Sequence, residues 1–171
     1  MGHTKIIAKF LSILSRLLGV INLILVLYCL GCLVTGFNTS PYGEGKYLHI
    51  NYPFSDNPFM NIDNNIPYII FSFLLPLSLY AVFFWLLGGL FGVFSTAKLF
   101  TPDNLGYLKR FYLFNGLAPI LSVLIGCLFV EIEMGIWLLL VLHLVLAIFS
   151  WFIAQIFKQG LQLQHEQDLF I

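Results

Sequence analysis

Four apolar stretches without a single Asp, Glu, Lys or Arg dominate this chain: residues 17–36, 71–94, 111–130 and 134–157. The hydrocarbon core of a bilayer is about 30 Å thick, so a helix needs about 20 residues to cross it. The chain is 60% hydrophobic and 9% charged. Such a composition excludes a water-soluble fold and predicts an all-α membrane protein with four transmembrane helices.

With 171 residues there is room for one membrane domain and little else. We expect a single domain over residues 1–171, with an outer loop at 37–65 and a cytoplasmic tail at 158–171. The aromatic-rich outer loop contains an alternating stretch at 47–52, which is typical of a short strand or hairpin. Allowing for uncharged flanks, the expected spans are 17–36, 67–97, 103–130 and 134–157.

Basic residues are distributed very unevenly between the two sides that four spans would create. Lys46 alone falls in the outer loop, and seven of the eight basic residues flank the spans on the opposite side: Lys5, Lys9, Arg16, Lys98, Lys109, Arg110 and Lys158. The positive-inside rule therefore predicts a multi-pass inner-membrane protein with both termini in the cytoplasm. The formal net charge is zero and there is no run of like charge, so we expect no direct binding of nucleic acid.

The N-terminal region resembles a signal peptide in having basic residues before an apolar run. That run is 20 residues long at 17–36, which exceeds a usual signal-peptide core, so a retained anchor is favoured. Residues 4–16 alternate basic and apolar positions at helical spacing. They could lie on membrane lipid, or they could extend the first span into the cytoplasm.

The later spans contain helix-shaping residues. Pro76 and Pro119 each remove a backbone donor and predict kinks. Gly88 and Gly92 form a small-residue stripe that lets another helix approach closely. We favour packing within the chain over a homo-oligomer. In the loop that follows, Thr101 is a predicted cap for a helix that begins near Pro102.

Three polar side chains lie at membrane depth. Asn22 and Asn115 occupy similar depths in two helices that run in the same direction, which predicts a hydrogen bond between them. His143 is the one titratable nitrogen near the bilayer centre. An intramembrane histidine can serve as a proton relay or ligand contact. Because no charged residue accompanies it, a neutral histidine bonded to a neighbouring helix is favoured.

The cysteines and histidines do not predict a metal or redox centre. Cys29 and Cys32 form a Cys-x-x-Cys pair, and Cys127 lies at comparable depth in another span. An apolar setting disfavours thiolate chemistry, so the favoured role is that of small hydrophobic side chains. We expect no cofactor, no metal and no catalytic residue, and an enzyme is the weakest reading.

The C-terminal segment has the sharpest non-membrane pattern, G-x-x-L-Q-x-E-x-D-L-x-I, formed by Gly160, Leu163, Gln164, Glu166, Asp168, Leu169 and Ile171. Together with the loop residues Phe100, Thr101, Pro102 and Asn104, followed by Leu108 and Arg110, this pattern resembles a bacterial family of four-span integral membrane proteins, domain of unknown function twenty-nine seventy-five. The resemblance implies no activity. Members of that family are often encoded beside a small helix-turn-helix transcription regulator, so the resemblance implies such a regulator as a partner.

Two functions remain open at this stage. The first is a non-enzymatic sensor, adaptor or sequestering partner whose loop and tail face a cytoplasmic regulator. The second is a small transporter or channel component, in which Pro76, Pro119 and His143 would line the path. The tail itself has two predicted arrangements: it binds a partner, or it docks near Asn104 and Arg110 under the protein's own helices.

Overall fold

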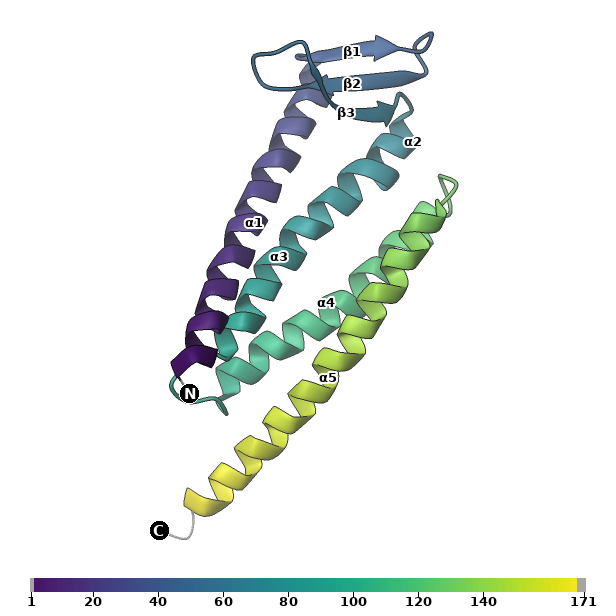
Figure 1. Ribbon diagram of the computed structural model, residues 1–171. Coiled ribbons are helices and arrows are strands. Elements are labelled where there is room, and N and C mark those ends of the chain that lie inside the picture. The colour runs from purple at the N-terminus through teal and green to yellow at the C-terminus, as the bar shows by residue number, and fades with distance from the viewer. Residues whose placement is uncertain (1, 169–171) are drawn as a thin grey trace.

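The computed structural model describes residues 2–168, and within them four helices are long and apolar enough to cross a membrane. They contain α1 (Gly2–Thr35), α3 (Leu75–Val93), α4 (Pro102–Gly126) and α5 (Met134–Asp168). The described chain starts and finishes at one end of the bundle, here called the terminal end, and a small sheet covers part of the other, the sheet end (Figure 1). This architecture is that of a multi-pass membrane protein.

Helix α1 starts at Gly2, well before the predicted start of the span at residue 17. The basic and apolar segment 4–16 is therefore a direct extension of the first span. Small buried residues recur along one face of α1, and they turn that face toward a neighbouring helix: Ala8, Ser12, Ser15 and Gly19. Their spacing of three and four residues is the helical repeat that keeps them on one side.

The second span begins with a short helix α2 (Ile66–Tyr68) and passes through a π-helical segment η1 (Ile69–Leu74) before α3. Pro76 is the second residue of α3, and its ring nitrogen lacks the amide hydrogen that would have bonded the carbonyl four residues earlier. The predicted disturbance at Pro76 thus takes the form of a wider helical turn. The helix ends at Val93, four residues before the predicted end.

Helix α4 starts as the sequence predicts. Thr101 accepts a hydrogen bond from the amide of Asn104 at 3.2 Å, and Pro102 is the first helical residue. The helix ends at Gly126, short of the predicted residue 130. Pro119 lies inside it, so the carbonyl of Asn115 loses its usual helical donor.

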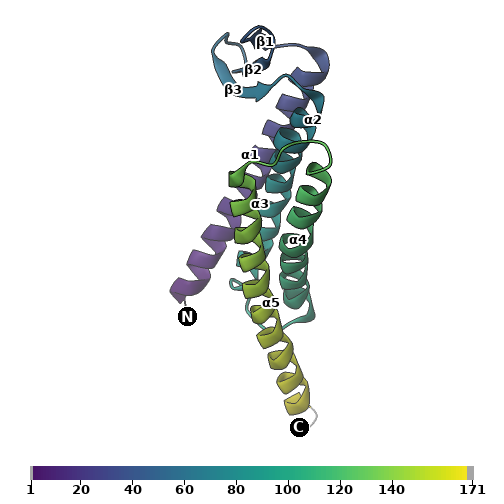
Figure 2. The same cartoon turned by 90° about the vertical axis from the view of Figure 1, so that its right-hand side faces the viewer.

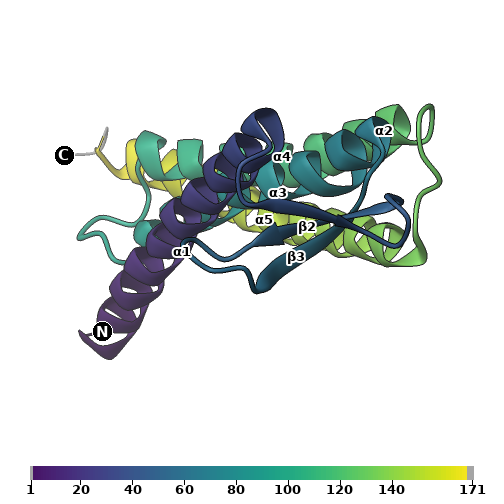
Figure 3. The ribbon, with the colours of Figure 1, turned by 90° about the horizontal axis from the view of Figure 1, so that it is seen from above.

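The outer loop is more structured than predicted, since it folds into three strands instead of a single strand or hairpin. β1 (Thr39–Tyr42), β2 (Tyr47–Asn51) and β3 (Pro58–Asp63) pair antiparallel in chain order. Gly43, Glu44 and Gly45 take positive φ in the first turn, where glycine costs least. Seen from above, the strands lie across the ends of the helices (Figure 3).

The helices pack in two pairs joined through the middle. α1 packs along α3, α4 packs along α5, and α3 contacts α4. A view turned by 90° shows α5 continuing beyond the ends of the other helices at the terminal end (Figure 2). The helices stay in contact down to the terminal end, where Ser12 of α1 bonds the carbonyl of Gly88 in α3, and only the last turns of α5 stand apart.

Candidate functional site

A hydrogen-bonded pair links α4 and α5 at membrane depth. The Nδ1 of His143 lies 2.7 Å from Oδ1 of Asn115, and Asn115 Nδ2 donates to the carbonyl of Phe111 at 2.8 Å. Because the amide nitrogen is the donor in the second bond, Oδ1 is the acceptor in the first, and His143 Nδ1 carries the proton. This is the neighbouring-helix partner that the sequence analysis favours for His143.

The predicted bond between Asn22 and Asn115 is wrong. Asn22 belongs to α1, which packs along α3, whereas Asn115 belongs to the α4–α5 pair. Asn115 is fully buried and bonded to His143. The buried Oδ1 of Asn22 has no hydrogen-bond partner among the described residues. Equal depth in the membrane did not bring the two amides together because helix order, which depth does not reveal, separates them.

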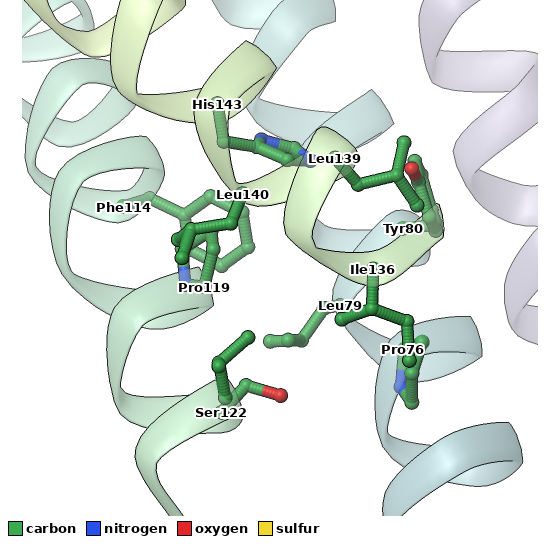
Figure 4. A pocket seen from close by; sticks show the side chains of 11 residues that line it. Pro76, Leu79, Tyr80, Phe114, Pro119, Ser122, Ile136, Leu139, Leu140 and His143 are labelled. Atoms are coloured by element: carbon green, nitrogen blue, oxygen red, sulfur yellow. The ribbon is translucent and has the colours of Figure 1, made fainter. Parts of the chain in front are cut away.

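A cavity of about 70 Å³ opens beside His143, between α3, α4 and α5 (Figure 4). Pro76 and Pro119 both line it, so the two predicted kink sites and the histidine meet at one place. Tyr80 and Ser122 bring hydroxyl groups to an otherwise mostly apolar wall. The rings of His143 and Phe83 also lie nearly perpendicular to each other, with their centroids 5.2 Å apart. The aromatic surroundings were missed because no local signal in the sequence pairs α3 with α5.

The glycine stripe lies against α1. A Cβ added at Gly88 would lie 2.6 Å from Cγ of Arg16 and 3.0 Å from the carbonyl oxygen of Ser12. At Gly92 the nearest atom would be the Ser12 hydroxyl, at 3.4 Å. Ser12 also donates a hydrogen bond to the carbonyl of Gly88 at 2.7 Å. The face of α1 that contacts this stripe has small residues at helical spacing. It was not predicted, although the same small-residue rule that predicts a contact at Gly88 applies to it.

Asn104 organises the loop between α3 and α4. Its buried side chain donates to the hydroxyl of Thr96 at 3.1 Å and to the carbonyls of Lys98 and Leu99 at 3.1 and 2.8 Å. Further along α4, the guanidinium of Arg110 lies 5.8 Å from the ring centre of Tyr107. Asn104 therefore has a structural role at the terminal end, because its hydrogen bonds hold the loop between α3 and α4 in one conformation.

The described part of the tail, through residue 168, does not dock as the second arrangement predicts. Helix α5 continues through Gly160, whose missing Cβ makes room for the ring of Phe100, 2.6 Å from that position. Beyond this contact Leu163 is 61% exposed, and Gln164 and Glu166 are exposed as well. Among the described residues of the tail, docking is thus limited to Gly160 and the half-buried Leu161. The side chain of Asp168, and Leu169 and Ile171, lie outside the described residues.

The three cysteines are not brought together. Cys29 and Cys32 are buried where α1 meets the sheet, and Cys127 is exposed just after α4. Within residues 2–168 no group of three metal-ligating side chains is close enough to hold an ion. Cys29 and Cys32 instead pack with Ile50 and Ile62 of the sheet.

A second hollow, of about 300 Å³, lies beneath the sheet. It is polar, and its wall combines tyrosines with two carboxylates: Tyr42, Tyr47, Tyr68, Asp63 and Glu133. Aromatic residues at this end fit a membrane-interface belt. Their side chains also form a stack, because the ring of Tyr42 lies 3.8 Å from that of His49 and 5.2 Å from that of Tyr47.

Comparisons of the chain with protein-family profiles, with curated proteins and with solved structures found no match. The residues and their geometry are therefore what supports a function.

Proposed function

We propose that the protein is a non-enzymatic membrane adaptor that presents the end of α5 to a cytoplasmic partner. The observation that carries the proposal is the helical continuation of α5 over residues 161–168, here called the α5 arm, in which residues 162–167 are exposed. It extends past the other helices (Figures 1 and 2). A helix that extends beyond its bundle and exposes an apolar side chain can bind in a groove of a partner protein.

The chemistry of the arm favours a partner with both apolar and basic surface. Leu163 is exposed on the arm, and Glu166 adds a carboxylate three residues later. An amphipathic helix binds by burying its apolar residues in a groove, while its charges set orientation. A small helix-turn-helix regulator, which the family resemblance implies, is the partner we propose. In that case the membrane protein would act as its sensor or sequestering site.

The proposal needs the arm to lie in the cytoplasm. The uneven distribution of the seven basic residues supports a bacterial inner-membrane protein with both termini inside. Reporter fusions after Tyr47 and after Ile171 should score outside and inside, respectively. If both fusions score on the same side, the adaptor proposal loses its geometric basis.

The decisive experiment compares the full chain with a variant that ends at Gly160. Both are expressed in native membranes, and cytoplasmic proteins bound to each are recovered and identified. We expect the truncated protein to keep its thermal stability in detergent, because the arm makes few contacts, and to lose the regulator. Leu163→Ser and Glu166→Lys should each weaken recovery, whereas Glu131→Lys, in the link between α4 and α5, should not. Equal recovery with and without the arm would refute the proposal.

A small transporter or channel component is the second candidate. The cavity at which Pro76, Pro119 and His143 meet is the observation that favours it. Kinked helices beside an intramembrane histidine are features of transport paths. Solute flux into liposomes that contain the purified protein, lost in His143→Leu, would support this candidate over the adaptor. Assembly into a homo-oligomer would be needed to widen a path of this size.

A further inference from the structure

A hollow of about 320 Å³ at the terminal end combines two positive charges with no negative one. It lies between α1, the last turns of α3 and the start of α4, and we call it the terminal hollow. Lys9 and Arg16 line it together with polar side chains from Ser12, Ser95, Thr96, Asn104 and Tyr107. No Asp or Glu occurs among the described residues that form its wall.

The two cations reach the terminal hollow from one face of α1. Lys9 and Arg16 are seven residues apart, which is about two helical turns, so they lie on the same side of the helix. The stem of Arg16 crosses α3 at Gly88, where any Cβ would collide with it. One guanidinium nitrogen lies 4.0 Å from the Cβ position of Gly92. The glycine stripe therefore lays the Arg16 side chain along α3 and brings its guanidinium to the hollow.

Capping of α3 does not account for these charges. Cations near a helix C-terminus often neutralise its free carbonyls. Here the carbonyl of Gly92 accepts from Ser95, and that of Val93 accepts from Thr96. Asn104 satisfies the carbonyls of Lys98 and Leu99 in the following loop. Because side chains of the α3–α4 connection already serve these acceptors, the charges of Lys9 and Arg16 remain available to a ligand.

We propose that the terminal hollow binds a phosphate group, which is carried either by the headgroup of an anionic phospholipid or by a soluble phosphate. Arginine offers paired donors that match two phosphate oxygens, and lysine adds a point charge. Basic pockets between transmembrane helices at the cytoplasmic side are sites at which acidic lipid headgroups bind. Ile13 lines the hollow, and Ile6 and Phe10 are exposed on the same segment of α1. These apolar neighbours suit a ligand that also carries acyl chains.

The test uses the purified full-length protein in a neutral detergent and two probes, short-chain phosphatidylglycerol and inorganic phosphate. Phosphatidylcholine with the same chains is the zwitterionic control. Bound lipid is counted by native mass spectrometry, and affinity is taken from the rise in thermal stability with concentration of each probe. We expect phosphatidylglycerol to bind and the double variant Lys9→Gln/Arg16→Gln to bind it at least about tenfold more weakly, a loss of 1.4 kcal/mol.

A matched variant separates a built site from general attraction to positive charge. Lys109→Gln/Lys158→Gln removes the same number of charges from the same end, and neither residue lines the terminal hollow. This variant should bind phosphatidylglycerol as the native protein does. Lys9→Gln alone leaves the Arg16 packing intact and should weaken binding, which keeps the test valid if the double variant does not fold.

The two probes also distinguish the source of the phosphate. Binding of inorganic phosphate that depends on Lys9 and Arg16, without binding of phosphatidylglycerol, would identify a soluble ligand. Equal loss in both double variants, equal binding of phosphatidylcholine, or no binding of either anionic probe would overturn the proposal.

Discussion

The sheet end and the membrane-spanning part of this protein are held together by different forces. At the sheet end, Ile50 and Cys29 are fully buried and pack with Cys32 and Ile62 into one apolar cluster. Between the helices, an apolar cluster of Val93, Leu108, Ala154 and Phe157 is joined by close backbone approaches and single hydrogen bonds. The Ser12–Gly88 bond joins the first pair, and the Asn115–His143 bond joins the second.

The contrast follows from what surrounds each region. Removing the apolar side chains of the sheet, Ile50 and Ile62, from water stabilises the sheet-end cluster in the ordinary way. Lipid tails are as apolar as leucine, so helices inside the bilayer gain nothing comparable by burying leucines against each other. Small residues and polar pairs carry the specificity there. Substitutions of similar size should therefore have different consequences in the two regions.

The largest effect should come from Ile50→Ala. Truncation of a fully buried aliphatic side chain typically costs about 2–5 kcal/mol, because apolar contact is lost and a cavity remains. The free energy of unfolding in detergent, with Ile66→Ala as the control, measures this. Ile66 is 71% exposed at the same end, so its truncation should change little. If the two variants unfold alike, the sheet is not held by its apolar cluster.

A smaller effect should come from Gly88→Ala. The added methyl would lie 3.0 Å from the backbone oxygen of Ser12, and overpacking of this kind costs about 1–3 kcal/mol. Gly92→Ala is the matched control, since its methyl would make an ordinary 3.4 Å contact. Helix propensity favours alanine more at Gly88, in the interior of α3, than at Gly92, in its last turn, so a lower thermal stability of Gly88→Ala reports the close approach. Equal stabilities would mean that α1 and α3 can separate at no cost.

Local patterns in the sequence predicted the spans and the Thr101 cap, because hydropathy and capping depend on residues close together in the chain. Gly88 was also placed correctly at a helix contact, although its partner, the Ser12 face of α1, was not. The third strand escaped prediction because residues 58–63 contain Pro and Asn, and pairing with β2 provides their extended form. In the docked arrangement of the tail, Leu163 was expected to pack against apolar residues. Because α5 continues as a helix past Gly160, Leu163 instead extends away from the bundle.

At the candidate site, the clearest error of prediction concerns the hydrogen-bond partner of Asn115. The Asn115–His143 bond also gives the smallest of the expected effects. Hydrogen bonds between membrane helices average only about 0.6 kcal/mol, because the separated helices find other partners. A double-mutant cycle of Asn115→Ala and His143→Ala should therefore give a coupling energy of that order, with a ceiling near 1.7 kcal/mol. The same cycle with Asn22→Ala in place of Asn115→Ala should give none, since Asn22 lies in the other helix pair. Unfolding free energies in bicelles, where the helices stay in lipid, are the measurement. Coupling of His143 to Asn22 instead of Asn115 would contradict the Asn115–His143 bond and show that the two helix pairs are arranged differently in a bilayer.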